Sequence, residues 1–264
     1  STLRDAYIIA DFAERRELIR KGVTKAAEGE GGTAVIDGSL LNEVTALNEW
    51  PVPLLGGFEE RFLAVPAEAL VSSMAEHQKY FHVVDSNNKL LPLFITVANI
   101  ESKDPAQVIN GNERVIRPRL ADAAFFYETD LKTTLEARRE SLKSIVFQAK
   151  LGSIFDKTER VAKLAIALAP ATGADSSLAR RAAELSKSDL VTEMVGEFAD
   201  LQGTMGRYYA SNDGEHSEVA EALFEQYLPR YAGDDIPSTA TGATLALADS
   251  CLLYTSDAAD EEDS

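Results

Sequence analysis

Three arginines fall within six residues in the middle of the chain, and an aromatic cluster follows them. The stretch 111–132 reads GNERVIRPRLADAAFFYETDLK, in which Arg114, Arg117 and Arg119 precede the FFY triplet at 125–127. Guanidinium groups bind phosphates, and aromatic rings stack on exposed bases. This combination of side chains predicts contact with a polyanion, above all with RNA.

The same stretch also allows a purely structural interpretation. A helix could pair its arginines with Glu113, Asp122 and Glu128 and bury its aromatic rings in a core. Runs of charge are usually solvated helix faces, so composition by itself favours this second interpretation. The two interpretations differ in the partner of the guanidinium groups, which is an external polyanion in the first and acidic side chains of the same chain in the second.

The charge of the chain is unevenly distributed. The 264 residues have a formal net charge of −17. Residues 1–113 contain ten basic and seventeen acidic side chains, residues 114–163 eleven and seven, and residues 164–264 five and nineteen. The field of the whole chain therefore repels nucleic acid. An RNA contact must be local, or a second subunit must supply the attraction.

Two lysines extend the set of candidate binding residues. Lys132 closes the arginine stretch, and Lys79 lies in EHQKYF (residues 76–81) between His77 and His82. Lys79 is the weaker candidate, because these residues could equally form the cationic end of a helix. The chain has one cysteine and contains no glycine-rich phosphate loop, CxxC or HExxH motif. These motifs would have indicated nucleotide, zinc or redox sites.

The elements that must position these residues differ between the two halves of the chain. Apolar spacing predicts helices over 3–26 and 67–78. The segments 79–84 and 90–99 have strand character, and the polar link 85–89 between them predicts a hairpin. The first half is therefore expected to be α+β.

The second half is expected to be all-α. Helical spacing begins at Pro118 and continues along the chain, with one helix predicted over 178–199 and another beginning at Ala240. Gly111 and Asn112 both tolerate positive φ, so they are expected to form the turn that aims the arginine segment.

A helical second half admits an HD-type metal-dependent phosphohydrolase, whose ligands are a spaced His, a His-Asp pair and a later Asp. Asp189 stands where such a pair could fall, but Ser188 occupies the position of its histidine. A divalent ion held by Asp189 alone would lack the nitrogen ligands that this chemistry uses. Glu193 and Glu197 share a face of the predicted helix, where solvated acids are the simpler interpretation.

Six segments in the same order resemble the beta subunit of the bacterial heterotetrameric glycine–tRNA ligase. They are EHQKYF (76–81), FITVANI (94–100), the arginine stretch (111–132), VFQAKLGSIFDKTERV (146–161), DLVTEMVGEFADLQGTMGRYYA (189–210) and EQYLPRYAGDDIPST (225–239). The likeness extends to about Asp249, so the chain is expected to be an internal fragment of that longer subunit. Residues 250–264 depart from the family pattern and are expected to be a non-native tail.

The resemblance implies an α+β N-terminal region at residues 1–132 followed by an all-α HD-like helical domain at 133–249 that has lost its hydrolase chemistry. It also implies an alpha subunit that holds the class II catalytic core, with ATP and Mg²⁺. This fragment itself is expected to contain no catalytic residue, metal or cofactor. The family's anticodon-binding domain lies outside the chain.

The resemblance finally implies a cytoplasmic protein whose partners are the alpha subunit and tRNA(Gly), without a membrane or DNA. The expected role is tRNA binding and assembly. Arg114, Arg117, Arg119 and Lys132, and more weakly Lys79, are expected to contact tRNA phosphates or an acidic surface of the alpha subunit. The alternatives are the phosphohydrolase and a protein–protein scaffold whose basic segment pairs with an acidic partner.

Overall fold

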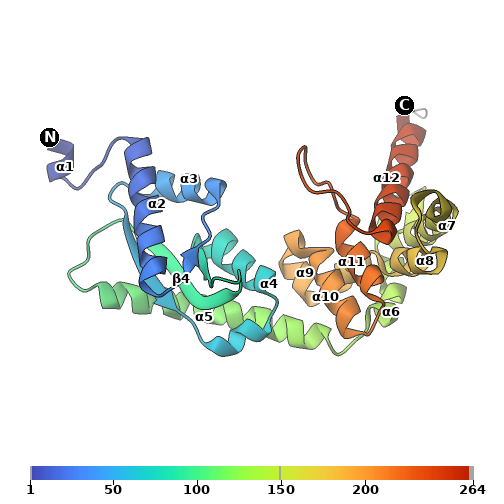
Figure 1. Cartoon of the computed structure of the whole chain (residues 1–264), viewed down its shortest axis with the longest axis horizontal. Helices are drawn as coiled ribbons and strands as arrows, with labels where there is room; N and C mark the ends of the chain where they lie inside the picture. The colour runs from blue at the N-terminus through green and yellow to red at the C-terminus, as the bar shows by residue number, and fades with distance from the viewer. Residues whose placement is uncertain (1, 149, 262–264) are drawn as a thin grey trace. The chain divides into compact units, whose positions relative to one another are not determined.

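The computed structural model describes residues 2–148 and 150–261, and the chain forms two compact units, Ser1–Phe125 and Phe126–Ser264 (Figure 1). The boundary between the units lies inside helix α5 (Pro105–Asp130). The predicted domain boundary, after residue 132, falls just beyond the end of this helix.

The first unit combines helices with a four-stranded antiparallel sheet. Its strands are β1 (Thr33–Ala34), β2 (Val52–Gly57), β3 (Phe81–Val84) and β4 (Leu90–Ala98), in the order β1-β3-β4-β2. Its other helices are α1 (Thr2–Asp5), α2 (Phe12–Gly29), α3 (Gly38–Leu47), a 3-10 helix (Glu60–Ala64), and α4 (Ala67–Ser72) with a π-helical turn (Ser73–His77).

The predicted hairpin between the two central strands is confirmed. The carboxylate of Asp85 accepts hydrogen bonds from the backbone amides of Asn87 and Lys89 at 2.8 and 2.9 Å. Asn88 adopts a φ of 60°, which asparagine tolerates better than most residues. Local turn chemistry therefore suffices to set this connection.

The core of the first unit lies between α2, α3 and the sheet. Ile19, Val23 and Ala27 recur at intervals of four along α2 and pack against residues of α3 and the sheet, including Leu41 and Phe81. The single helix predicted over 3–26 is wrong, because the structure divides it into α1 and α2. The Asp11 side chain caps α2 by accepting a hydrogen bond from the amide of Glu14, which starts the new helix at this point.

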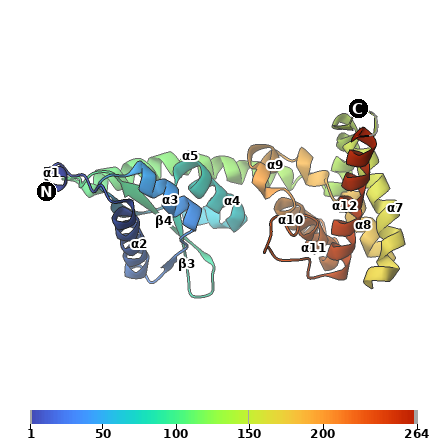
Figure 2. The same cartoon turned by 90° about the horizontal axis from the view of Figure 1, so that it is seen from above.

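The second unit is almost entirely helical. Its α-helices are α6 (Leu135–Arg138), α7 (Ile154–Thr172), α8 (Ser176–Leu185), α9 (Glu193–Glu197), α10 (Thr204–Asn212), α11 (Ser217–Glu225) and α12 (Ala240–Glu261). Its 3-10 helices are Arg139–Ser144, Ser188–Val191 and Ala199–Leu201. Helices α7, α8 and α12 pack side by side (Figures 1 and 2).

The predicted order, an α+β region followed by a helical region, is confirmed with one exception. Strands β5 (Val146–Gln148) and β6 (Gly152–Ser153) form a short antiparallel hairpin ahead of α7, so the second half is not all-α. Gly152 has a φ of 89°, a conformation that glycine adopts without strain. The HD-like assignment of this unit stays a prediction.

The predicted helix over 178–199 is wrong. Helix α8 ends at Leu185, and a 3-10 turn separates it from α9. The Thr192 hydroxyl accepts a hydrogen bond from the amide of Val195 and so caps α9. The amides of Glu193 and Met194, at the start of α9, also donate to the carboxylate of Asp130, so tertiary contacts fix the break.

The predicted turn at Gly111 and Asn112 is also wrong, because α5 is continuous from Pro105 to Asp130. The Asn112 amide donates to the carbonyl of Val108 at 2.8 Å, and its oxygen accepts from the hydroxyl of Tyr80 at 2.6 Å. The side chain thereby joins the helix to the rest of the first unit instead of bending the chain.

Helix α12 continues past Asp249 to Glu261, and residues 262–264 lie outside the described residues. The non-native character of 250–264 stays a prediction. Among the helices that the structure describes, none has the length and hydropathy needed to cross a bilayer.

Candidate nucleic-acid interface

Helix α5 has one buried face that fixes its orientation in the first unit. Ile116, Leu120 and Ala123 are fully buried and recur at intervals of four and three, as residues on one face of a helix do. Arg114, Arg117 and Arg119 lie off this buried face and are exposed to solvent.

The three arginines are exposed. Arg117 donates from Nε to the Glu59 carboxylate at 2.7 Å, in a pair whose side chains are 51% and 39% exposed. Within the residues that the structure describes, Arg114 and Arg119 make no ion pair. The alternative in which Glu113 neutralises this segment is wrong, because the Glu113 carboxylate accepts instead from the amide of Gly57 at 3.0 Å.

One exposed line along α5 combines a cation with an aromatic ring. At about 100° per residue, Arg114, Pro118, Ala121 and Phe125 align on the side opposite Ile116. We call these four residues the arginine stripe. Phe125 is 63% exposed. A guanidinium and a ring on one face suit a phosphate and a base of the same nucleic-acid segment.

The other two aromatic residues of the triplet are half-buried. The ring of Tyr127 stacks on that of Tyr209, with centroids 5.9 Å apart, and burial raises the pKa of Tyr127. The prediction of a stacking-capable triplet therefore holds best for Phe125. Lys132 is exposed on the turn after α5, in the second unit.

Lys79 lies in an acidic environment in the first unit. Its ammonium group is 3.0 Å from the Glu43 carboxylate, and both residues line a cavity of about 250 Å³ together with Asp37, Glu76 and His82. Burial lowers the pKa of His82, which disfavours a positive charge there. Phosphate would be repelled by these carboxylates, so the surroundings of Lys79 favour a structural ion pair over a phosphate contact.

Asp130 was not singled out by the sequence, yet its side chain is fully buried at the end of α5. It accepts hydrogen bonds from the amides of Glu193 and Met194 at 3.0 Å each and from the Tyr209 hydroxyl at 2.8 Å. Arg138 completes the set with an ion pair at 3.1 Å. This carboxylate connects the end of α5 to the start of α9 and to α10.

Asp189, the candidate metal ligand, also binds backbone amides. It is 1% exposed and accepts from the amides of Gly203 and Gly206 at 2.5 and 3.2 Å. Burial raises its pKa. Within the described ranges, no three His, Cys, Asp or Glu side chains are grouped so that they could hold a metal ion. The geometry of Asp189 therefore gives the phosphohydrolase alternative no support.

Asp249 lies between two buried lysines in the second unit. Its carboxylate oxygens are 2.6 Å from the Lys157 ammonium and 3.1 Å from that of Lys187, which also lies 4.2 Å from the centre of the Tyr227 ring. Burial opposes the ionised form of Asp249, but the two cations outweigh it and lower its pKa. This network ties α12 to α7 and to the residue that precedes the 3-10 helix Ser188–Val191.

Comparison with known proteins agrees with the resemblance of the sequence motifs. The family described as glycyl-tRNA synthetase beta subunit matches residues 1–252. The glycine–tRNA ligase beta subunit of Marinobacter nauticus is 70% identical over 247 residues, which are 93% of this chain and 36% of that protein. The corresponding proteins of Hahella chejuensis and Stutzerimonas stutzeri are 61% identical over 243 residues and 60% identical over 247.

Those two alignments cover 92% and 94% of this chain but 35% and 36% of the relatives. The chain thus spans roughly a third of the length of the curated proteins it matches, at an identity that establishes common descent. The chain belongs to the family of glycyl-tRNA synthetase beta subunits.

Proposed function

We propose that this chain is a tRNA-binding and assembly part of a glycine–tRNA ligase beta subunit. In this proposal the alpha subunit performs ATP-dependent glycylation with Mg²⁺, and the two subunits form a heterotetramer in the cytoplasm. The names of the relatives support both partners, since a beta subunit of a tRNA ligase implies another subunit and a tRNA substrate.

The observation that carries the proposal is the arginine stripe. Its guanidinium at Arg114 has no internal ion-pair partner within the described residues, and Phe125 presents an exposed ring on the same face. A planar guanidinium grips phosphate through two parallel hydrogen bonds, and a ring stacks on an unpaired base. The buried face of α5 holds both groups in position before tRNA arrives, which reduces the entropy lost on binding.

The test uses the full-length beta subunit assembled with its alpha subunit. We expect Arg114→Ala in the stripe, combined with Arg119→Ala, an exposed arginine of α5 outside the stripe that also makes no ion pair within the described residues, to weaken tRNA(Gly) binding on the order of tenfold or more, because each lost charged hydrogen bond contributes about 1.5–3 kcal/mol. The slope of log affinity against log salt should fall by about 0.9 for each duplex phosphate contact removed. Fluorescence anisotropy with labelled tRNA across a salt series measures both quantities.

Lys25→Ala provides a matched control, because Lys25 is an exposed cation on α2 of the same unit. It removes a positive charge that lies outside the arginine stripe. The affinity for tRNA(Gly) and the slope of log affinity against log salt should therefore stay unchanged. Unchanged tRNA binding in the double variant would exclude the tRNA role of these arginines. If sedimentation showed loss of the alpha subunit while tRNA binding by the remaining complex was unaltered, the scaffold interpretation would replace it.

A further inference from the structure

Residues of α3, α4, the π-helical turn Ser73–His77 and β3 enclose a hollow of about 250 Å³ in the first unit. We call it the acidic hollow. Pockets for nucleotides, cofactors and other small molecules usually have volumes of about 300–1,000 Å³. The acidic hollow is smaller, so its size suits one long amino-acid side chain better than a free ligand of that kind.

The acidic hollow has a net negative charge. Asp37, Glu43 and Glu76 line it, together with one lysine, Lys79. The Lys79 ammonium lies 3.0 Å from the Glu43 carboxylate, so these two charges neutralise each other. Asp37 and Glu76 remain as carboxylates without a compensating cation in the lining. The field of these two groups attracts a cation and repels phosphate.

Two polar side chains of the acidic hollow, Glu76 and His82, make no hydrogen bond or ion pair with any residue that the structure describes. Glu76 is exposed and His82 is half-buried. Because burial lowers the pKa of His82, its imidazole is neutral and offers one nitrogen as an acceptor. Asp37 accepts hydrogen bonds from the hydroxyl and amide of Ser39 and from the amide of Leu40, all on Oδ1, and these bonds lower its pKa. The lining therefore offers acceptors from α3, the π-helical turn and β3.

Apolar side chains form the rest of the lining, namely Val35, Leu40, Val71 and Ala75. Long cationic side chains bury their methylene stems against such surface and keep the charged head beside polar groups. An arginine fits better than a lysine, because its planar guanidinium presents five N–H donors that reach acceptors on different walls. The ammonium of lysine is a compact point charge.

An unusual backbone fixes the wall that contains Glu76. Residues Ser73–His77 form a π-helical turn, and Lys79 has a φ of 59°. The Tyr80 amide donates to the carbonyl of Met74 at 2.9 Å and closes this turn. Positive φ is uncommon for residues other than glycine, and both features occur frequently at functional sites. The turn holds Glu76 and Lys79 in the lining before any partner arrives.

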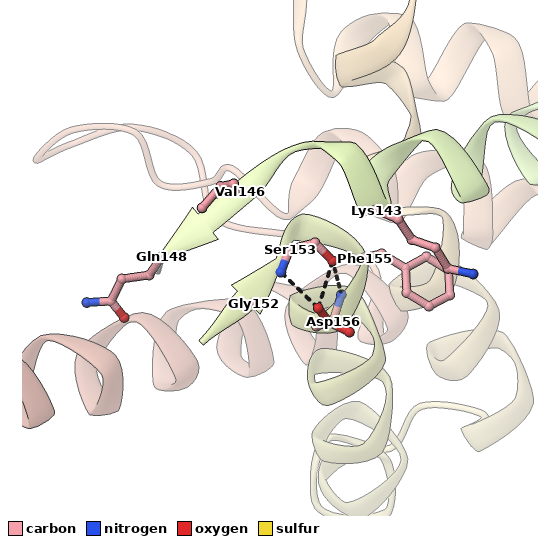
Figure 3. Close-up of a pocket in the computed structure, with 7 residues that line it drawn as sticks. All are labelled: Lys143, Val146, Gln148, Gly152, Ser153, Phe155 and Asp156. Carbon is pink, nitrogen blue, oxygen red and sulfur yellow. Dashed lines mark hydrogen bonds between the residues drawn. The ribbon is translucent and has the colours of Figure 1, made fainter. Parts of the chain in front are cut away.

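The larger hollow beside the β5–β6 hairpin, of about 630 Å³, differs in that its polar groups bind one another (Figure 3). The amide and hydroxyl of Ser153 donate to the Asp156 carboxylate at 2.8 Å. Lys143 pairs with Glu140 at 2.7 Å, and its ammonium lies 4.6 Å from the centre of the Phe155 ring. A ligand would have to displace these contacts, which is not required in the acidic hollow.

We propose that the acidic hollow receives an arginine side chain of the alpha subunit, an inference that rests on the assembly role in the proposed function. The methylene stem packs on the apolar lining, and the guanidinium donates to the carboxylates of Glu76 and Asp37 and to the imidazole of His82. The occupant is a protein because the carboxylates repel tRNA phosphates. Arginines that insert into pockets of a partner are frequent hot spots of protein–protein interfaces.

Association of the full-length beta subunit with its alpha subunit tests the inference. We expect Glu76→Gln to weaken this association on the order of tenfold, because the variant loses a charged hydrogen bond to the arginine. Sedimentation across a dilution series measures the dissociation constant. Glu28→Gln is the matched control, because Glu28 is an exposed acid on α2 that does not line the hollow. It should leave the association unchanged.

A charge exchange identifies the occupant. Glu76→Arg should weaken the association more than Glu76→Gln does, because two cations then face each other. Replacement of one particular arginine of the alpha subunit by glutamate should restore it, and a scan of the exposed arginines of that subunit finds this residue. Because Glu76 is exposed and has no partner among the described residues, both variants should keep the far-UV circular dichroism spectrum of the unmodified subunit. The inference is wrong if no arginine of the alpha subunit restores the association.

The outcomes separate this inference from the proposed function. If the unmodified subunits associate and Glu76→Gln and Glu28→Gln bind the alpha subunit equally well, the arginine site is wrong and the proposed function stands. If Glu76→Gln weakens tRNA(Gly) binding but not subunit association, the hollow is a nucleic-acid contact and the inference is also wrong. If the unmodified subunits do not associate, both the inference and the assembly role are wrong.

Discussion

Three buried carboxylates of the second unit accept hydrogen bonds from main-chain amides. Asp130 binds two amides of α9, Asp189 binds those of Gly203 and Gly206, and Glu225 binds those of Ser238 and Thr239. A buried carboxylate loses its hydration, and main-chain amides that donate to it offset part of that cost. Each of these residues therefore holds a main-chain segment that is distant in sequence.

Asp130→Asn should destabilise the second unit by about 3 kcal/mol or more, because one carboxylate oxygen becomes an amino group that faces donors. The Tyr209 hydroxyl and the Arg138 guanidinium are both donors to this side chain, and they would lose an acceptor in the interior. Urea denaturation followed by far-UV circular dichroism measures the change.

Asp122→Asn is the matched control, since Asp122 is an exposed residue on the same helix. This substitution should change the free energy of unfolding by no more than about 0.5 kcal/mol, as is usual for surface substitutions. Equal effects of the two substitutions would show that the Asp130 network contributes nothing specific to stability.

The continuous helix α5 positions the side chains of the proposed binding surface. Its continuity through Gly111 and Asn112 keeps Arg114 and Phe125 on one face, whereas a turn at 111–112 would have left the direction of the segment to a loop. A site on a helix is held more precisely than one on a loop, because the backbone is fixed by its own hydrogen bonds. The arginine stripe depends on this element as much as on its side chains.

Gly111→Ala should stabilise the chain by about 0.5–1 kcal/mol, because alanine loses less backbone entropy than glycine on forming a helix. A Cβ at this position meets no atom within 4 Å, so no clash offsets the gain. Equilibrium urea denaturation measures the change in the free energy of unfolding. Destabilisation would contradict the continuous helix and restore the turn.

Gly203→Ala gives the opposite expectation and controls for a general effect of alanine. Gly203 has a φ of 79°, and a Cβ there would lie 2.6 Å from the ring of Tyr227. This substitution should destabilise the chain through both backbone strain and overlap. The two variants together distinguish a helical glycine from one that the fold requires.

At the scale of the whole molecule, the chain has two units with separate interiors. The core of the first unit is formed by α2, α3 and the sheet, and that of the second by α7, α8, α10, α11 and α12. Chains with two such units commonly depart from two-state unfolding. The strongly negative C-terminal part and the basic 114–163 segment also confine any nucleic-acid contact to limited regions of the surface.

We expect the two units to unfold in distinct transitions in urea. The single tryptophan, Trp50, lies in the first unit, so its fluorescence reports on that unit, while circular dichroism is dominated by the helices of both. The two signals should give different midpoints. Asp130→Asn should shift the circular dichroism curve and leave the Trp50 midpoint in place. Coincident curves that move together would show that the chain unfolds as one cooperative unit.

Local patterns in the sequence determined the family, one hairpin and the division of the chain into two kinds of region. The family was identifiable from ordered motifs, and the β3–β4 hairpin from the polar link 85–89, because turn preferences act over a few residues. The exposure of Arg114, Arg117 and Arg119 followed the tendency of charge to remain solvated. The division into an α+β and a helical region followed from apolar periodicity.

Only the tertiary structure decided the features that depend on residues far apart in the chain. The break after Leu185 rests partly on Asp130, which binds amides more than sixty residues away. The ion pair of Lys79 depends on Glu43, and the hydrogen bond that joins Asn112 to the rest of the first unit depends on Tyr80. Such contacts carry no local signature, because a buried acid and a surface acid have the same letter in the sequence. Burial and partners, which set their free energies, exist only once the chain has folded.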